Sequence, residues 1–285
     1  MASGLIAIRR RIKSVAATRK ITKAMELVAT AKLKKNKDRY QATTGYTGEI
    51  ASITANVLVR AKDHEHMYLQ EVKGKGTLYI VVTSNLGLCG AYNANVYKEF
   101  VPKYKPEDKI LVVGLKGFNH FRKRNLNVIH SMLTEVTGQE QLQASEIARF
   151  ALTEYKNKSI SKIVLVYTRY VNSVTFQPVT LDLLPVDPRQ FEVKVGKGKD
   201  FLDTLFEPNI DAVLDSLVPL YFESILYGKL VEAHTSEQAA RRLAMENATD
   251  NADEIKEKLL IIYNKQRQSA ITQEMSEIVA GANAI

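Results

Sequence analysis

Helix-stopping residues are missing from both ends of this 285-residue chain. All seven prolines lie between Pro102 and Pro219, and no glycine occurs between Gly4 and Gly45. Residues 220–285 contain no proline and only two glycines. Because a helix interior tolerates proline and glycine least, each end of the chain can form one long, uninterrupted helix.

Apolar or small residues step by threes and fours along the first segment. They are Leu5, Ile8, Ile12, Val15, Thr22, Met25 and Ala29. This spacing keeps one stripe of a helix facing a partner helix, as in a coiled coil. The stripe is thinned by small side chains, which allow close helix approach but bury little area; these are Thr22, Ala24, Ala29 and Ala31. We expect a helix from about residue 3 to 58, ~80 Å long.

The last segment has a similar stripe. Its positions are Leu214, Leu217, Tyr221, Ile225, Ala239, Ala240, Leu243, Ala244, Ala248, Ile255, Leu259 and Ile262. A compact domain between the two helices makes antiparallel pairing easy. Because the second helix is longer, roughly 20 residues or ~30 Å of it should project beyond the first. We expect this exposed end to need a socket in another protein.

The middle of the chain alternates short β-branched runs with helix-like stretches, which is typical of a parallel sheet with covering helices. The expected strands are residues 77–84, 109–115 and 161–170, and the expected helices are residues 91–104 and 139–156. Residues 174–186 contain two prolines, which favours an edge strand that closes a hairpin, and residues 187–200 should form a return loop.

The predicted fold class is therefore α/β, with a long antiparallel coiled coil of the N- and C-terminal helices and a central Rossmann-like α/β domain. The expected boundaries are residues 1–60 and 209–285 for the two coiled-coil helices and residues 75–190 for the α/β domain.

Candidate catalytic and metal motifs are weak. Residues 85–90 follow the first strand, but they lack the glycine pattern of a phosphate-binding loop, so we interpret them, like residues 114–117, as packing turns. His64 and His66 are two residues apart and splay on a helix, which favours a solvated linker over a metal site. Cys89 is the only cysteine, which excludes an intrachain disulfide and indicates a small buried hydrophobe. The sequence predicts no catalytic residue, metal or cofactor.

Positive charge is concentrated in the first helix. Residues 1–40 hold twelve lysines and arginines against two acids, whereas the whole chain has a net charge of +9. An acidic partner would offset the self-repulsion of these cations. A nucleic-acid-binding coiled coil is one alternative, although base-stacking aromatics are missing before Tyr40. A small α/β enzyme with helical arms is another. No apolar run approaches the length of a membrane span.

Several segments resemble the gamma subunit of F-type ATP synthases. At the amino end these are residues 12–15 (IKSV) and 21–29 (ITKAMELVA). In the second helix they are residues 237–245 (EQAARRLAM), 248–252 (ATDNA) and 270–282 (AITQEMSEIVAGA). The order of the motifs and the position of the α/β insert agree as well, so the resemblance covers the whole chain.

This resemblance implies a rotor. The terminal helices would turn inside a ring of alpha and beta subunits, while the α/β domain would lie on the membrane c-ring beside the epsilon subunit. Catalytic residues and nucleotide would belong to the beta subunit, and nucleic acid would not be a partner. The membrane would be reached only through the complex. The lack of a presequence favours a bacterial subunit, peripheral on the cytoplasmic side of the cell membrane. Cys89 alone does not provide the cysteine pair of the chloroplast branch, so thiol control is not expected.

The resemblance also implies partner-binding residues. Arg241, Gln268, Thr272 and Glu277 match positions that contact the mobile carboxyl-terminal domains of beta, and Met25 matches a position near an acidic loop of beta. The projecting end would enter an apolar collar through Ile271, Met275, Ile278, Val279, Ala280, Ala282, Ala284 and Ile285.

Overall fold

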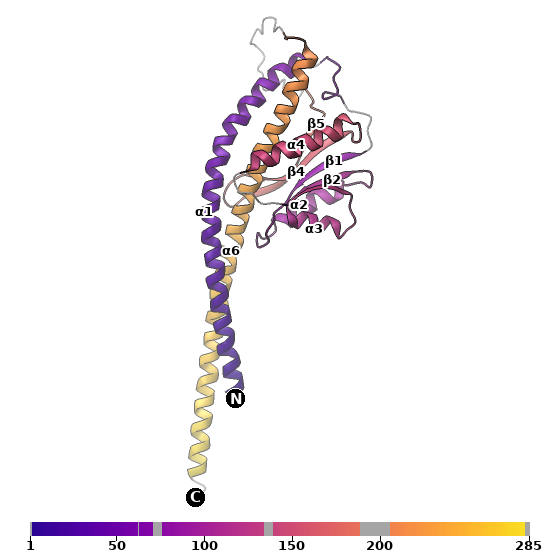
Figure 1. Ribbon diagram of the computed structural model, residues 1–285. Coiled ribbons are helices and arrows are strands. Elements are labelled where there is room, and N and C mark those ends of the chain that lie inside the picture. Colours follow the sequence, from indigo (N-terminus) through magenta and orange to yellow (C-terminus); the bar gives the residue numbers. More distant parts are fainter. Residues whose placement is uncertain (1, 62, 71–75, 134–138, 189–205, 283–285) are drawn as a thin grey trace. The chain divides into compact units, whose positions relative to one another are not determined.

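The computed structural model describes residues 2–61, 63–70, 76–133, 139–188 and 206–282 (Figure 1). Two long helices, α1 (Ala2–Arg60) and α6 (Ile210–Ala282), enclose the α/β segment in the sequence. The shorter elements are β1 (Thr77–Val82), α2 (Tyr92–Phe100), a 3-10 turn (Val101–Lys103), β2 (Lys109–Val113), α3 (Leu115–Arg122), β3 (Val128–Met132), α4 (Glu140–Lys156), β4 (Lys162–Tyr170) and β5 (Phe176–Leu184).

The chain divides into two compact units. One combines Met1–Ala31 with Arg241–Ile285 and is called the helical unit below; the other is Lys32–Ala240 and is called the sheet unit. Both long helices contribute to both units, and the fold class expected from the sequence is confirmed. α6 continues through Pro219, although the missing N–H removes one intrahelical hydrogen bond. Burial of Leu214, Val218 and Phe222 stabilises the helix on both sides of this proline.

The sheet unit contains five strands in the order β3-β2-β1-β4-β5. β3, β2, β1 and β4 are parallel, as in a doubly wound α/β fold, whereas β5 pairs with β4 antiparallel. The β4–β5 turn is stabilised by Asn172, whose Oδ1 accepts hydrogen bonds from the N–H groups of Val174 and Thr175. The predicted hairpin with an edge strand is therefore confirmed.

Alternate residues of the central strands face two different cores, because side chains alternate across a strand. On β1, Leu78 and Ile80 belong to the core that contains α4 and parts of α1 and α6. Tyr79 and Val81 face the opposite core with α2 and α3. Figure 1 shows α4 on one face of the sheet and α2 and α3 on the other. The first core fixes the sheet to the two long helices.

Residues 114–117, after β2, form a packing turn, as expected, whereas within residues 85–90, after β1, only Cys89 is buried. Gly114 has a φ of +100°, and a Cβ on it would lie 2.2 Å from the carbonyl oxygen of Thr83. The N–H of Gly117 donates to Thr83 Oγ1 at 3.0 Å, which holds the start of α3 against the end of β1. Cys89 is buried after β1, as predicted.

The histidines of the predicted linker meet different carboxylates of α6. His64 Nε2 lies 2.7 Å from Asp211 Oδ1, and His66 Nε2 lies 3.6 Å from Asp215 Oδ1. In the described parts of the chain, no group of three His, Cys, Asp or Glu residues could hold a metal ion. The expected return loop, residues 187–200, lies almost entirely outside the described residues.

Two elements of the sheet unit escaped the sequence analysis. β3 has the sequence VIHSM, in which His130 and Ser131 interrupt the apolar run, and all five residues are half-buried. α3 is only eight residues long, too short for a clear helical period. Across the described residues, no helix is both long enough and apolar enough to cross a membrane.

Candidate partner-binding site

The helical unit is built on the predicted seam. All seven expected stripe residues of α1, from Leu5 to Ala29, are buried or half-buried. The interpretation of two other small residues was wrong, because Ala24 and Ala31 point away from the partner helix and are exposed. Close approach on this stretch of α1 therefore depends on Thr22 and Ala29.

On α6 the expected seam is confirmed at Leu259, which is buried, but is wrong at Ile255 and Ile262, which are about half exposed. Ala252, which was not expected in the seam, is buried on the same stripe as Leu259. Both pairs are spaced by seven residues and form adjacent stripes that lie about 60° apart around the helix. The periodicity of one helix cannot decide which of two adjacent apolar stripes faces its partner, and the structure selects the stripe with the smaller residue.

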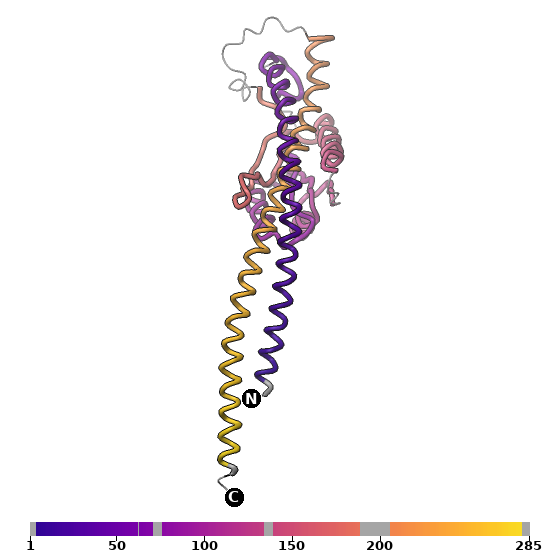
Figure 2. Tube along the Cα trace, turned by 90° about the vertical axis from the view of Figure 1, so that its left-hand side faces the viewer, coloured from indigo at the N-terminus to yellow at the C-terminus, as the bar shows by residue number. Residues whose placement is uncertain are grey.

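Polar contacts fix the register of the two helices. Arg19 Nε lies 2.8 and 2.9 Å from the two carboxylate oxygens of Asp253. The hydroxyl of Thr249 donates to Thr22 Oγ1 at 2.8 Å, and the hydroxyl of Thr22 donates to the backbone oxygen of Arg19. Figures 1 and 2 show the two helices side by side in this unit. These contacts confirm antiparallel pairing.

Replacing Thr249 by valine is expected to destabilise the helical unit. The side chain keeps its shape, but Thr22 Oγ1 loses its donor in a largely buried seam, which should lower the free energy of unfolding by about 1 to 2 kcal/mol. Urea unfolding followed by helical circular dichroism measures the change. The matched control is Thr30→Val, since Thr30 is exposed and bonds only to its own helix at Glu26. An equal loss in both variants would contradict a role for the Thr249–Thr22 contact.

The carboxyl end of α6 extends past the start of α1. A Cβ on Gly4 would lie 3.6 Å from Gln266 Oε1, so the beginning of α1 lies beside Gln266. α6 continues to Ala282, roughly 16 residues or about 24 Å farther. Four large apolar side chains on this extension are more than half exposed: Ile271 (52%), Met275 (62%), Ile278 (69%) and Val279 (56%). Ala284 and Ile285, also expected at this end, lie outside the described residues.

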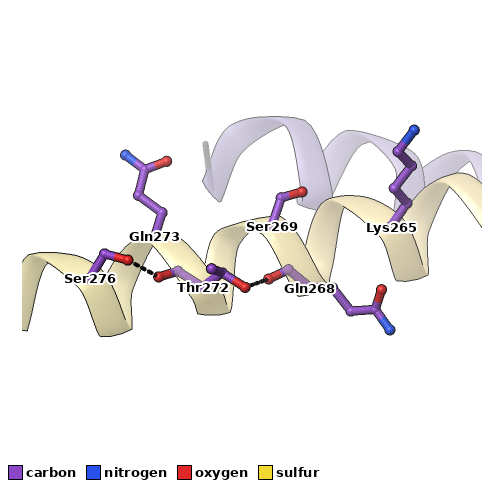
Figure 3. Close-up of a pocket in the computed structure, with 6 residues that line it drawn as sticks. All are labelled: Lys265, Gln268, Ser269, Thr272, Gln273 and Ser276. Atoms are coloured by element: carbon purple, nitrogen blue, oxygen red, sulfur yellow. Dashed lines mark hydrogen bonds between the residues drawn. The ribbon is translucent and has the colours of Figure 1, made fainter.

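A shallow polar groove of ≈490 Å³ runs along this part of α6 (Figure 3). It is lined by Lys265, Gln268, Ser269, Thr272, Gln273 and Ser276. Figure 3 shows Lys265, Ser269 and Gln273 on one side of the helix and the side chain of Gln268 on the other. An adjoining apolar groove of ≈460 Å³ includes Met275 and Val279 and shares Thr272 and Ser276 with the first. The two grooves give this end a polar surface followed by an apolar one.

Hydrogen bonds along the helix orient the polar side chains of this surface. The Thr272 hydroxyl donates to the backbone oxygen of Gln268, and the Ser276 hydroxyl donates to that of Thr272, both at 2.9 Å. Gln273 Nε2 donates to Glu277 Oε1 at 2.9 Å. Nearer the seam, a hydrogen bond from Lys258 lowers the pKa of exposed Glu254. The groove itself offers neutral donors and acceptors with one cation, Lys265, which suits reversible contact with another protein.

The expected partner-binding residues do not form one cluster. Gln268 and Thr272 are neighbours in the polar groove, and exposed Glu277 directly follows its last lining residue. Met25 is half-buried on α1. Arg241 lies about 40 Å before Gln268 along α6 and is only 7% exposed.

Sequence reasoning missed four other lining residues of the groove: Lys265, Ser269, Gln273 and Ser276. Their signal is a set of polar side chains spaced by three and four residues, which places them on one face of a helix. That signal has meaning only once this face is known to be free of a partner helix.

The fold and this surface define a class: a protein with paired terminal helices, an inserted α/β domain and a helix end exposed for contact with other proteins. The family model described as ATP synthase matches residues 4–285. The ATP synthase gamma chain of Brevibacillus brevis is 40% identical over 294 residues, covering 100% of this chain and 99% of that one. The chain belongs to the ATP synthase gamma chain family.

Other relatives agree with this assignment. The ATP synthase gamma chain of Alkaliphilus metalliredigens is 38% identical over 289 residues, with both chains fully covered. Among solved structures, a chain of the Euglena gracilis mitochondrial ATP synthase in rotational state 3 has a TM-score of 0.74 at 21% identity. It covers 100% of this chain and 95% of that chain, which shows that the fold is shared throughout.

Proposed function

We propose that this chain is the central rotor shaft of an F-type ATP synthase, coupling proton-driven rotation to ATP synthesis at the catalytic sites of the beta subunits. The match of residues 4–285 to this family, with gamma chains aligned over their whole length, carries the proposal. The subunit is a non-catalytic part of the complex. Neither the family nor the relatives support the nucleic-acid alternative.

The helical unit suits a part that turns inside other proteins. Its seam is narrow, with Thr22, Ala29 and Ala252 at the contact, so two helices pack closely into a slender shaft. Along the polar groove of α6, neutral hydroxyl and amide groups make hydrogen bonds that exchange readily with water, at a net value of only about 1 kcal/mol each.

The partners in this proposal are the alpha and beta subunits, the epsilon subunit and the c-ring. Two solved structures with the same fold come from assemblies described as rotor and as OSCP/F1/c-ring. The chain is a peripheral subunit that is associated with the membrane through the complex. We propose the cytoplasmic side of a bacterial cell membrane as its location, and domain boundaries at residues 1–60, 75–190 and 209–285.

The proposed contacts to beta are made by Met25, Arg241, Gln268, Thr272 and Glu277. Gln268, Thr272 and Glu277 are accessible on the free chain. Arg241 is almost fully buried there, so it can donate to beta carboxylates only after its side chain turns outward. Met25 is uncharged and only partly buried, which suits a position beside an acidic segment that must be passed at every turn.

Reconstitution tests the function. The chain alone is expected to hydrolyse no ATP, and mixing it with the alpha and beta subunits of the same organism should give a complex with one copy per ring. Chain stoichiometry is measured by native mass spectrometry, and hydrolysis is measured on the same samples. ATP turnover by the pure chain, or a ring that assembles with several copies, would overturn the proposal.

Replacing Thr272 by valine tests the proposed contact. Losing one neutral hydrogen bond at an interface should weaken binding of the chain to the alpha–beta ring about two- to tenfold. The matched control is Thr153→Val, because Thr153 is also exposed and also donates to the carbonyl four residues earlier, at Arg149 on α4. Titration of labelled chain into the ring measures both variants. If Thr272→Val binds as tightly as the control, Thr272 is not a contact residue.

A further inference from the structure

One turn of α6 in the sheet unit is buried although it is largely polar. Its residues, 232–236, are called the anchored turn here. Glu232 is 2% exposed, and Thr235 and Ser236 are fully buried. A buried polar turn is unusual in a helix, because each polar group must find a partner. The partners of the anchored turn lie on several other elements of the sheet unit.

Three hydrogen bonds join the anchored turn to the sheet and its covering helix. Ser236 Oγ donates to the backbone oxygen of Thr168 on β4 at 3.0 Å. The N–H of Tyr170, at the end of β4, donates to Glu232 Oε1 at 3.2 Å. From α2, the hydroxyl of Tyr92 donates to the backbone oxygen of Ala233 at 3.2 Å. The anchored turn is therefore bonded from two directions.

The buried charge of Glu232 is paired on the same side. Lys229 Nζ lies 2.9 Å from Glu232 Oε2 and 5.4 Å from the centre of the Tyr167 ring on β4. Burial alone would lower the pKa of Lys229, but Glu232 and Tyr167 outweigh it, so the pKa is raised and the lysine stays charged. Lys229 and Glu232 thus form an ion pair within α6, and its two members contact β4 through the Tyr167 ring and the Tyr170 N–H.

The hydrogen bonds of the anchored turn are directional and can therefore hold α6 in one orientation, which apolar packing cannot do. Apolar contacts are non-directional, so a smooth helix could rotate or slide on the sheet with little change in energy. The hydrogen bonds that Thr168, Tyr170 and Tyr92 make with the anchored turn are satisfied in one register only. Fixing a register is the best-attested use of polar groups in a core. The anchored turn therefore fixes both the rotation of α6 about its own axis and its axial position relative to β4.

We propose that the anchored turn is where the α/β domain is locked in rotation to α6, so that torque entering this domain passes to the shaft at residues 232–236. The inference rests on the proposed rotor function. Tyr92 and Ser236 are positioning residues in this scheme, because they act on α6 and not on nucleotide or on beta.

The test removes the two hydroxyl donors with Tyr92→Phe and Ser236→Ala together. On the isolated full chain, hydrogen exchange of the amides in residues 232–240 should accelerate about fivefold for each bond lost. In the reconstituted complex in membrane vesicles, ATP hydrolysis should stay at the wild-type rate, with a partial loss of protons transported per ATP hydrolysed. A residue that only stabilised the fold would not change this ratio.

The matched control is Tyr155→Phe with Ser161→Ala. Both hydroxyls donate to backbone oxygens of the sheet unit that lie outside α6, Tyr155 to Met67 and Ser161 to Gly76. The control should leave exchange in residues 232–240 and the transport ratio unchanged. The proposal is refuted if the Tyr92→Phe, Ser236→Ala variant shows faster amide exchange but a normal number of protons transported per ATP. It is also refuted if the control variant loses proton transport to the same extent.

Two further results of this experiment also have a defined meaning. If the wild-type complex transports no protons, the rotor function itself fails, and the lock fails with it. If the double variant does not fold, Tyr92→Phe and Ser236→Ala are measured singly. Each single variant is expected to show a smaller loss of protons transported per ATP hydrolysed. Normal transport in both folded single variants overturns the proposal.

Discussion

A lysine in place of Met25 is expected to reduce proton-driven ATP synthesis about tenfold, because a new ion pair of roughly 1.4 kcal/mol in one rotational position slows departure from it by that factor. Met25 is half-buried on α1, so the long stem of lysine can follow the same path with its charge in water. The fold should therefore be retained. ATP synthesis and proton flux are measured on the same vesicles, and the melting temperature of the isolated chain is measured separately.

The control for this variant is Met25→Leu, which keeps the size and the apolar character of the side chain. It should synthesise ATP at close to the wild-type rate. High salt should partly restore the rate of ATP synthesis by Met25→Lys, because exposed charges are screened. An unchanged rate of ATP synthesis in Met25→Lys would remove Met25 from the mechanism, and equal losses in both variants would indicate a packing effect.

Alanine in place of Gly114 is expected to destabilise the sheet unit by about 2 to 6 kcal/mol, since an unfavourable φ and an overpacked contact cost roughly 1 to 3 kcal/mol each. The backbone of Gly114 has a φ of +100°, which side chains of L-residues rarely adopt, and the added Cβ would lie 2.2 Å from the Thr83 carbonyl oxygen. Both atoms in that contact are fixed by the sheet, because Thr83 Oγ1 also donates to Val113.

Gly87 supplies the matched control. It lies in the corresponding turn after β1, and a Cβ there would meet nothing closer than Lys116 Cε at 3.6 Å. Gly87→Ala should therefore change the free energy of unfolding by less than about 1 kcal/mol. Urea unfolding of the full chain, followed by tyrosine fluorescence, compares the two. A Gly114→Ala protein as stable as the control would contradict the packing of this turn.

Much of the fold could be predicted because its signals are local. The scarcity of proline and glycine at the ends, together with the apolar stripes, predicts α1 and α6 nearly to their observed limits, since a helix depends on its own local hydrogen bonds. β1, β2 and β4 are recognisable as buried β-branched runs. β3 is not, because an edge strand is half-buried and tolerates His130 and Ser131.

The partner-binding residues were obtained from resemblance and stay a prediction. Their positions in the structure separate into two kinds. Gln268, Thr272 and Glu277 are on the exposed extension of α6, where a partner can reach them. Arg241 lies on the same helix but is buried. The neighbouring sequence does not indicate this, because burial depends on which other elements surround that turn.

The amino-acid sequence by itself determined the two long helices, the stripe of α1, the alternation of strands and helices between them and the family. Each of these follows from local propensity, from a period along one segment or from the order of motifs. Only the tertiary structure decided that Ala252 faces α1 while Ile255 does not, and that the polar turn at Glu232 is buried against β4. These outcomes depend on which surfaces meet in three dimensions, because the free energy of a side chain is set by its neighbours across the fold and not along the chain.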